Sequence, residues 1–214
     1  MAQIFPKWSN QIPKLVLLAL LIGGSAVVFV FWYWFSPWHL DIGYEPKQPV
    51  PFSHKLHAGQ LGIDCRFCHA GVEISSVAGV PPTQTCMVCH AQIKKDSVNL
   101  SHVMESWNTD MPIVWRRVYH LPEYVYFDHS AHVHNGVGCI SCHGRVDELV
   151  RVRQEMPLSM GWCLECHRNP APHLRPLDKI TDMAWRGDES WAKQAVERAT
   201  KLHPPTVSCT GCHR

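Results

Sequence analysis

The hydrophobic pattern of the chain changes abruptly after its first forty residues. Residues 15–35 form a run without Asp, Glu, Lys or Arg, and a helix of about 20 apolar residues is long enough to cross a bilayer. Four aromatic residues crowd the far end of the run, as they do at a membrane interface. They are Trp32, Tyr33, Trp34 and Trp38. The pattern predicts a transmembrane anchor at residues 15–38, preceded by a short cytoplasmic tail at residues 1–14.

Two lysines, Lys7 and Lys14, precede the run. Because positive charge is retained on the cytoplasmic side, they place the N-terminus in the cytoplasm and the residues after the anchor on the opposite side. A cleaved signal peptide is the alternative, but it has a shorter apolar core that ends in small residues at a cleavage site. The bulky aromatic end of this run favours a segment that stays uncleaved.

Beyond the anchor, no long regular element is expected. A proline-containing linker is predicted at residues 39–51, and residues 52–214 are rich in turn residues such as the Pro81-Pro82 pair. The best helix candidate is residues 189–202, where Asp188 can cap the first turn. We therefore predict a mostly irregular fold with short α-helices and few strands at most, after a single N-terminal transmembrane helix.

The amino-acid composition excludes several classes of function and directs attention to cysteine and histidine. The chain has 214 residues and a net charge of +2 with its histidines neutral, so no excess of basic residues indicates nucleic-acid binding. There is no glycine-rich phosphate loop and no His-Glu-x-x-His zinc motif. Cysteine and histidine are instead unusually frequent, with 10 and 15 copies.

The ten cysteines form five copies of one motif, Cys-x-x-Cys-His, with no cysteine left over. In chain order, motif 1 is Cys65, Cys68 and His69; motif 2 is Cys86, Cys89 and His90; motif 3 is Cys139, Cys142 and His143; motif 4 is Cys163, Cys166 and His167; motif 5 is Cys209, Cys212 and His213. We expect a short helix at each motif.

Three other uses of cysteine compete with haem attachment as the explanation. A disulfide scaffold suits an exported domain, but it does not require a histidine after every second cysteine. Tetrahedral zinc sites would pair the motifs two by two, and five is an odd number. A thioredoxin-like motif occurs singly on a βαβ pattern, which this sequence lacks. Five complete motifs therefore favour covalent haem.

Haem chemistry explains the spacing within each motif. The two cysteines would form thioethers to the porphyrin edge, and the adjacent histidine would then reach the iron from one side. Covalent attachment holds the haem even where little protein surrounds it. We expect five covalent c-type haems, which would form much of the buried apolar mass of residues 52–214.

Two segments repeat a longer pattern upstream of a motif. Residues 52–69 and 127–143 both read aromatic-x-His-x-x-His, then a glycine-bearing stretch, then Cys-x-x-Cys-His. Each segment is followed by a second motif. The chain is therefore predicted to contain two two-haem units, at about 52–100 and 127–170, with a fifth haem at 209–213.

An iron that only carries electrons needs a second axial ligand opposite the motif histidine. The repeated pattern supplies four candidates for these distal ligands, two in each unit. They are His54, His57, His129 and His132. Histidines three residues apart lie on neighbouring positions of one helical face, so the two members of each pair are expected to serve adjacent haems. Surface histidines are the alternative.

The fifth distal ligand is the least determined. His120 lies shortly before the second pair and is the preferred candidate. The alternatives are His102, His134, His173, His203, Met156 and Met160. A methionine ligand would raise the reduction potential of its haem, and an open iron with five ligands is a further alternative.

Four segments of the sequence together resemble a known family. They are FSHKLHAGQLGIDCRFCH, VPPTQTCMVCH, VYFDHSAHVHNGVGCISCHG and LSMGWCLECHRNP. They resemble the pentahaem cytochrome c subunit of alternative complex III, a membrane-anchored, class III, c7-like multihaem cytochrome. The resemblance covers most of the haem region closely, together with the single anchor.

This resemblance implies a respiratory or photosynthetic complex in the bacterial cytoplasmic membrane that oxidises quinol. The chain would cross the membrane once, with its haem region on the periplasmic side. It would take electrons from an iron–sulfur subunit and pass them to a monohaem cytochrome c or another soluble acceptor. Polytopic membrane subunits would oxidise the quinol, so the resemblance implies no catalytic site in this chain.

Two enzyme classes are the alternatives. A membrane-anchored multihaem quinol dehydrogenase, acting alone or with a terminal reductase, also has one N-terminal helix, but its first haem motif follows the membrane closely. Here Cys65 lies well beyond Phe35. A reductase with a substrate-binding haem often departs from Cys-x-x-Cys-His at that haem, and no motif here departs from it. Electron transfer without catalysis is therefore the preferred function.

Overall fold

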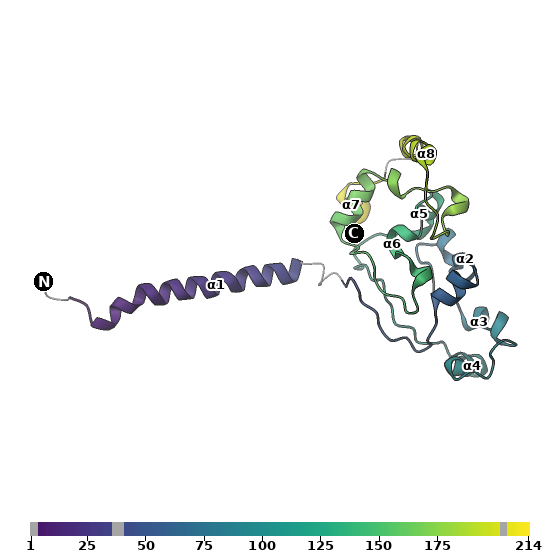
Figure 1. Cartoon of the computed structure of the whole chain (residues 1–214), viewed down its shortest axis with the longest axis horizontal. Coiled ribbons are helices and arrows are strands. Elements are labelled where there is room, and N and C mark those ends of the chain that lie inside the picture. The colour runs from purple at the N-terminus through teal and green to yellow at the C-terminus, as the bar shows by residue number, and fades with distance from the viewer. Residues whose placement is uncertain (1–3, 36–40, 202–204) are drawn as a thin grey trace. The chain divides into compact units, whose positions relative to one another are not determined.

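The computed structural model describes residues 4–35, 41–201 and 205–214. The chain divides into two compact units, Met1–Asp41 and Ile42–Arg214 (Figure 1). We call them the N-terminal unit and the C-terminal unit. Residues 36–38 of the predicted anchor, with Trp38 among them, lie outside the described residues.

The N-terminal unit consists of a 3-10 helix, η1 (Lys7–Gln11), and one long helix, α1 (Ile12–Phe35). Pro13 stands in the first turn of α1, where its missing N–H leaves no hydrogen bond unmade. At about 1.5 Å per residue, the 24 residues of α1 span a length close to that of a bilayer core. The helix is therefore long and apolar enough to cross a membrane.

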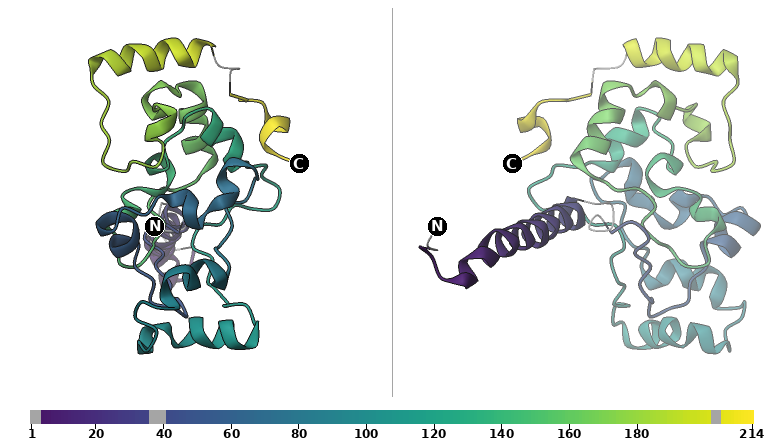
Figure 2. Two further views of the ribbon diagram at one scale, coloured as in Figure 1. Left: turned by 90° about the vertical axis from the view of Figure 1, so that its right-hand side faces the viewer. Right: turned by 60° about the vertical axis from the view of Figure 1, so that its left-hand side comes forward.

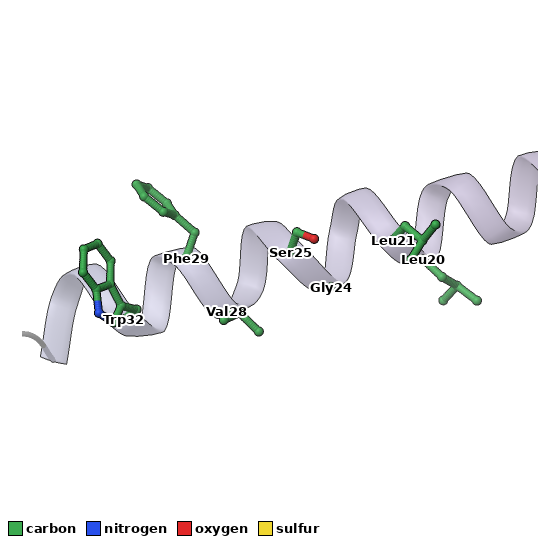
Figure 3. Close-up of a pocket in the computed structure, with 7 residues that line it drawn as sticks. All are labelled: Leu20, Leu21, Gly24, Ser25, Val28, Phe29 and Trp32. Carbon is green, nitrogen blue, oxygen red and sulfur yellow. The ribbon is translucent and has the colours of Figure 1, made fainter.

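A shallow groove runs along one side of α1 (Figure 3). It is lined by Leu20, Leu21, Gly24, Ser25, Val28, Phe29 and Trp32. The two small residues, Gly24 and Ser25, lie between larger apolar side chains. Small residues of this kind allow the backbone of a second helix to approach closely in a membrane.

The C-terminal unit consists of short helices joined by irregular segments. Its α-helices are α2 (Cys65–Cys68), α3 (Thr83–His90), α4 (Ser101–Thr109), α5 (His129–His134), α6 (Ile140–His143), α7 (Met160–Arg168), α8 (Glu189–Lys201) and α9 (Cys209–Cys212). It also contains a π-helix, η3 (Lys55–Gln60), and the 3-10 helices η4 (Ala70–Glu73), η5 (Val98–Leu100), η6 (Val146–Glu148), η7 (Ala171–His173) and η8 (Leu177–Lys179). The described residues include isolated β-bridges but no strand. The predicted fold class is confirmed.

The predicted helix at residues 189–202 is present as α8, which ends at Lys201 in the described part of the chain. The backbone N–H of Trp191 donates to Asp188 Oδ1 at 2.8 Å, so the predicted cap is made. Each motif also lies on a short helix, namely α2, α3, α6, α7 or α9. One helical turn brings two cysteines three residues apart to one side of the backbone.

The helices of the C-terminal unit follow one another along its length. Helices α4 and α3 lie at one end, α2, α5 and α6 lie in the middle, and α7 and α8 lie toward the other end (Figures 1 and 2). Helix α9 lies on the α7 side (Figure 2). The motifs are therefore spread along the unit and are not gathered at one point.

The apolar core of the C-terminal unit is small. Its largest cluster consists of Val50, Met87 and Val103, with Trp115 among the partly buried side chains packed against it. Many large apolar side chains elsewhere in the unit are exposed. Such a core supplies little hydrophobic stabilisation for its length, as expected if cofactors form part of the buried mass.

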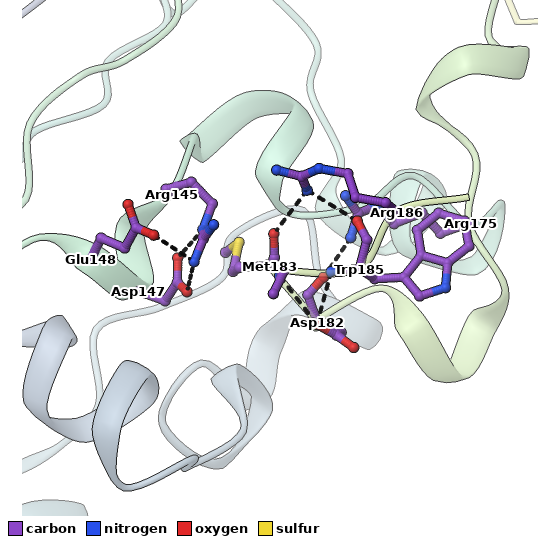
Figure 4. A network of polar contacts seen from close by, with 9 residues as sticks. Arg145, Asp147, Glu148, Arg175, Asp182, Met183, Trp185 and Arg186 are labelled. Atoms are coloured by element: carbon purple, nitrogen blue, oxygen red, sulfur yellow. Dashed lines mark hydrogen bonds and ion pairs between the residues drawn. The ribbon is translucent and has the colours of Figure 1, made fainter. Parts of the chain in front are cut away.

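A buried arginine fixes the segment beside motif 3 (Figure 4). Arg175 is only 8% exposed, and its Nη1 donates to the Asp182 carbonyl at 2.5 Å while its guanidinium lies 5.1 Å from the Trp185 ring centre. A Cβ at Gly138 would lie 2.5 Å from the Arg175 side chain, so the contact requires glycine there. The Cys139 N–H donates to the Ile180 carbonyl at 3.1 Å, which ties the same segment to motif 3.

Candidate functional site

The five motifs present paired thiols. All ten cysteines are free, with no disulfide between them. In the described part of the chain, no three side chains among Cys, His, Asp and Glu converge as metal ligands, whereas a structural zinc site needs four. The arrangement therefore fits thioether attachment to a large cofactor better than a disulfide scaffold or zinc.

Four motif histidines each face a second imidazole ring. The ring-centre distances are 6.5 Å for His54–His69, 6.2 Å for His57–His90, 6.5 Å for His129–His143 and 6.1 Å for His132–His167. The first and third pairs are nearly parallel, with interplanar angles of 2° and 11°. In each pair one ring belongs to a motif, and the other is one of the four histidines predicted as distal ligands.

The ring separation fits a metal ion held between two imidazoles. A metal–imidazole bond is about 2 Å long, and the ring centre lies about 1 Å behind the bonding nitrogen. Two imidazoles on opposite sides of one iron therefore have their centres about 6 Å apart. A bis-histidine haem iron meets these requirements, because the porphyrin fills the four other positions.

Main-chain carbonyls hold most of these rings by Nδ1. The contacts are His57 to Ser53 at 2.9 Å, His69 to Gly79 at 2.9 Å, His90 to Ile93 at 2.9 Å, His129 to Ser76 at 2.8 Å, His132 to Asp128 at 2.6 Å and His167 to Thr206 at 2.7 Å. Because a carbonyl only accepts, Nδ1 carries the proton and Nε2 keeps its lone pair. This is the tautomer that a metal-binding imidazole needs.

Burial keeps several of these imidazoles neutral. The pKa of His54 is lowered to about 4, first by burial and then by the neighbouring His69 and His57. The pKa of His143 is likewise lowered to about 4, first by burial and then by the nearby imidazoles of His129, His69 and His54. A neutral imidazole is the form that binds iron. The Nδ1 atom of His54 is buried without a hydrogen-bond partner.

Two phenylalanines position the upstream histidines, a role that the sequence analysis did not assign. Phe52 packs against both His54 and His57, with ring centres 4.9 and 4.3 Å away. Phe127 packs in the same way against His129 and His132, at 4.7 and 4.9 Å. The signal was the aromatic residue at the start of the repeated pattern.

The fifth motif differs from the other four. The His213 ring lies 5.8 Å from the ring of Tyr124, and Val125 forms a β-bridge with His213. Within residues 4–35, 41–201 and 205–214, no imidazole is recorded opposite His213. His120 is exposed. It follows Tyr119, whose ring centre lies 4.5 Å from that of His143, and precedes Tyr124 in the same segment.

The other candidates for the fifth ligand lie apart from the four ring pairs. His102 is exposed, and its Nδ1 lies 3.4 Å from a carboxylate oxygen of Glu105. His134 and Met160 are exposed, and His173 and Met156 are half-buried. His203 lies outside the described residues.

Two family models match the chain. The class III cytochrome c family matches residues 39–113, which include motifs 1 and 2. Cytochrome c3 matches residues 131–214, which include motifs 3, 4 and 5. The two matches divide the chain between the two repeated units.

A curated relative gives a third comparison. The menaquinone reductase, multiheme cytochrome c subunit, of Nitratidesulfovibrio vulgaris (strain Hildenborough) is 35% identical to this chain over 122 residues. The match covers 56% of this chain and 56% of the relative. The chain thus spans about half the length of that relative.

Proposed function

We propose that this chain, a multihaem cytochrome c of the class III, c3-type family, is an electron-transfer relay in a quinone-linked membrane complex. Covalent c-type haem, when bound, supplies an iron that changes oxidation state by one electron. The observation that carries the proposal is the set of four opposed imidazole pairs beside paired thiols.

In this proposal each motif holds one haem, so the chain carries five. We number the haem sites 1 to 5 after their motifs. The ten cysteines attach the haems, and the motif histidines His69, His90, His143, His167 and His213 are the proximal ligands. The distal ligands are His54 at site 1, His57 at site 2, His129 at site 3 and His132 at site 4. His120 is the candidate distal ligand at site 5. Its segment leads to Tyr124, whose ring lies beside His213, but the His120 ring itself does not contact His213.

Two axial ligands at an iron favour electron transfer over substrate binding. At sites 1 to 4 the two imidazoles of each pair would both bind the iron of a haem held there, and would leave no room for a substrate on it. The carbonyls on Nδ1 and the rings of Phe52 and Phe127 hold the imidazoles in place, so little rearrangement would accompany a change in charge. These features support a relay in which substrate chemistry takes place on other subunits.

The membrane anchor supports a place in a membrane complex. Helix α1 is long and apolar enough to cross a bilayer, and its groove at Gly24 and Ser25 offers a contact for a partner helix. In this proposal the N-terminus is cytoplasmic, and the C-terminal unit lies on the periplasmic side of a bacterial cytoplasmic membrane.

At the finer level, we propose the relay subunit of alternative complex III. Integral membrane subunits and an iron–sulfur subunit would deliver electrons from quinol, and a monohaem cytochrome c or another soluble carrier would receive them. The resemblance of the motif segments to that subunit supports this assignment.

A second candidate reverses the direction of flow. The relative from Nitratidesulfovibrio vulgaris is named as a subunit of a menaquinone reductase, so a related complex here would deliver electrons from a periplasmic donor to quinone. The same bis-histidine sites would serve either direction. A third candidate, a multihaem quinol dehydrogenase acting without other redox subunits, requires this chain to bind quinol itself.

Purification of the chain from its native membranes, with mass spectrometry of the co-purifying subunits, tests the proposal. We expect iron–sulfur and polytopic membrane subunits, and haem reduction by a quinol or haem oxidation by a quinone only in the assembled complex. The faster of these two reactions distinguishes the first candidate from the second. Recovery of the chain without redox partners, but with quinol oxidation activity, would establish the third candidate and exclude the relay.

A further inference from the structure

We infer that the five haem sites follow one another in space in the order 2, 1, 3, 4, 5, which differs from their order in the chain. The inference rests on the proposed function only in that each motif holds a haem. It comes from the contacts at four junctions: between motifs 2 and 1, 1 and 3, 3 and 4, and 4 and 5.

The junction of motifs 1 and 3 is built by reciprocal packing of the two repeated units. Helix η3, which carries the distal histidine His57, packs on η6, the turn that follows motif 3, and the Lys55 N–H donates to the Leu149 carbonyl at 2.9 Å. Gly59 of η3 lies so close to the Asp147 carbonyl that a Cβ would overlap it. The first unit therefore lies against the residues after motif 3.

The second two-haem unit makes the matching contact with the first two-haem unit. Helix α5, which carries His129 and His132, packs on η4, the turn that follows motif 1. The Ser130 N–H donates to the Ser75 carbonyl at 3.2 Å, and His129 Nδ1 donates to the Ser76 carbonyl at 2.8 Å. Each ligand helix is thus held by the turn that follows the first motif of the other unit.

Direct contacts between the motifs agree with this packing. The side chains of Cys65 and Cys139, the first cysteines of motifs 1 and 3, lie side by side. The His143 imidazole of motif 3 lies near the His69 and His54 imidazoles of the first two-haem unit. Motifs 1 and 3 are therefore neighbours, although motif 2 lies between them in the chain.

Within each unit, one ligand helix joins two sites. His54 and His57 are three residues apart and face motifs 1 and 2. His129 and His132 have the same spacing and face motifs 3 and 4. Site 2 therefore lies beside site 1, and site 4 lies beside site 3.

Motif 5 extends the series beyond motif 4. The carbonyl of Thr206 accepts from Nδ1 of His167 at 2.7 Å, and a Cβ at Gly211 within motif 5 would meet the Thr206 side chain. The segment that completes site 4 is therefore the one that carries site 5.

The two ends of the series are sites 2 and 5. Site 2 is carried by α3, beside α4 at one end of the C-terminal unit, and α9 with site 5 lies on the α7 side (Figures 1 and 2). The two units meet at sites 1 and 3 in the middle. The two ends of the series therefore lie at α3 and at α9.

Double variants, in which the distal ligands of two sites are replaced, test the order while all five haems stay attached. A distal His→Met substitution raises the potential of its own site, so a double variant has two sites that titrate apart from the rest. In His54→Met/His129→Met the marked sites are 1 and 3, and in His57→Met/His129→Met they are 2 and 3. Redox titration followed by optical and electron paramagnetic resonance spectra measures how reduction of one marked site affects the other.

The order 2, 1, 3, 4, 5 predicts coupling in the first variant only. Reduction of site 1 should disfavour reduction of site 3 by about threefold or more, whereas sites 2 and 3 should titrate independently, because screening weakens charges separated by more than about 10 Å. Chain order predicts the reverse, with sites 2 and 3 coupled and sites 1 and 3 independent, and that result would overturn the inference. Where methionine does not bind the iron, the resulting high-spin signal marks the same site. The titration needs neither quinone nor partner, so its outcome is separate from the test of the proposed function.

Discussion

Main-chain carbonyls orient the candidate ligands from very different distances along the chain. His57 and His132 each donate to the carbonyl four residues earlier, within their own turn. His129 instead donates to Ser76, 53 residues away, and His167 donates to Thr206, 39 residues away. The first two rings are therefore positioned by local structure, and the last two depend on tertiary packing.

Replacement of one distal histidine should change one haem and leave the others unaltered. In His54→Ala, site 1 would lose its second axial ligand, while Cys65 and Cys68 would still attach the haem. We expect a high-spin ferric signal from one haem in electron paramagnetic resonance spectra. The pyridine haemochrome assay should still give five haems per chain.

His102→Ala is the matched control for this variant. His102 is exposed and lies 3.4 Å from Glu105, apart from the four ring pairs, so its removal should leave the spin state of every haem as in the wild type. Loss of one whole haem in His54→Ala, or a wild-type spectrum, would contradict the distal role of His54.

The sequence alone nominates candidate ligands but does not pair them. Cys-x-x-Cys-His is a local pattern, so the ten cysteines and five following histidines can be predicted as haem-binding residues without a structure. The repeat around His54 and His129 identified the upstream histidines, but spacing alone did not say which motif each one faces. That choice depends on tertiary packing, and for His120 the packing supplies no ring contact with His213.

Asp64, beside motif 1, should make the stability of the folded protein depend on pH in the acid range. The hydrogen bond from Arg66 holds the pKa of Asp64 down at about 2, against 3.8 ordinarily, with a further hydrogen bond from Thr181. Because the folded pKa is depressed, the stabilisation is complete above about pH 4 and is lost as the pH falls toward 2. In Asp64→Asn the midpoint of thermal unfolding should therefore change less between pH 5 and pH 2 than in the wild type.

The Asp64→Asn substitution removes the charge but keeps a side-chain oxygen that can cap the helix, so the test separates the effect of charge from that of the hydrogen bond. Asp64 accepts from the Arg66 N–H at the start of α2 at 2.9 Å, and asparagine caps helices about as well as aspartate. The variant should therefore be nearly as stable as the wild type near pH 2. At higher pH it should be less stable than the wild type, because it lacks the charge of Asp64. An equal pH dependence in Asp64→Asn and the wild type would contradict the assignment.

At the scale of elements, the contact between η3 and η6 joins the two repeated units. Gly59→Ala places a methyl group against the Asp147 carbonyl, where no side chain can yield. Overpacking of this kind costs about 1–3 kcal/mol. We expect a lower thermal midpoint, and weaker redox coupling between sites 1 and 3 if η3 moves away from η6.

Gly161→Ala provides the control for this substitution. Gly161 lies on α7, and a Cβ there would meet nothing within 4 Å. Alanine should be neutral or stabilise the helix by up to about 1 kcal/mol. A Gly59→Ala variant as stable as Gly161→Ala would show that the two elements are not in contact.

The repeat in the sequence predicted two similar units but not the way in which they meet. The equivalent segments differ locally, since residues 55–60 form a π-type turn and residues 129–134 an α-helix. Their reciprocal contacts with η6 and η4 join residues far apart in the chain, from 53 positions for His129 and Ser76 to 94 positions for Lys55 and Leu149. No local pattern encodes such contacts, so the neighbouring positions of sites 1 and 3 could not be predicted from the spacing of the motifs.

At the scale of the whole molecule, little apolar surface holds the C-terminal unit together. Eight hydrophobic residues are buried in the described part of the chain, and their largest cluster is Val50, Met87 and Val103. A domain of this length normally buries most of its apolar side chains. The sequence analysis anticipated this shortage from the density of motifs, because each haem bound at a motif would add apolar area that the polypeptide lacks.

The chain made without haem should therefore fail to fold in its C-terminal unit. Expression in cells that lack cytochrome c maturation gives this form without any substitution in the protein. We expect weak helical circular dichroism, no cooperative thermal transition and rapid proteolysis of residues 42–214, since burial of so few side chains does not offset the conformational entropy of ordering that chain. Helix α1 should still hold the product in the membrane against carbonate washing, because its hydrophobicity owes nothing to haem. A haem-free chain with a cooperative transition and wild-type resistance to protease would contradict the view that the haems form the core.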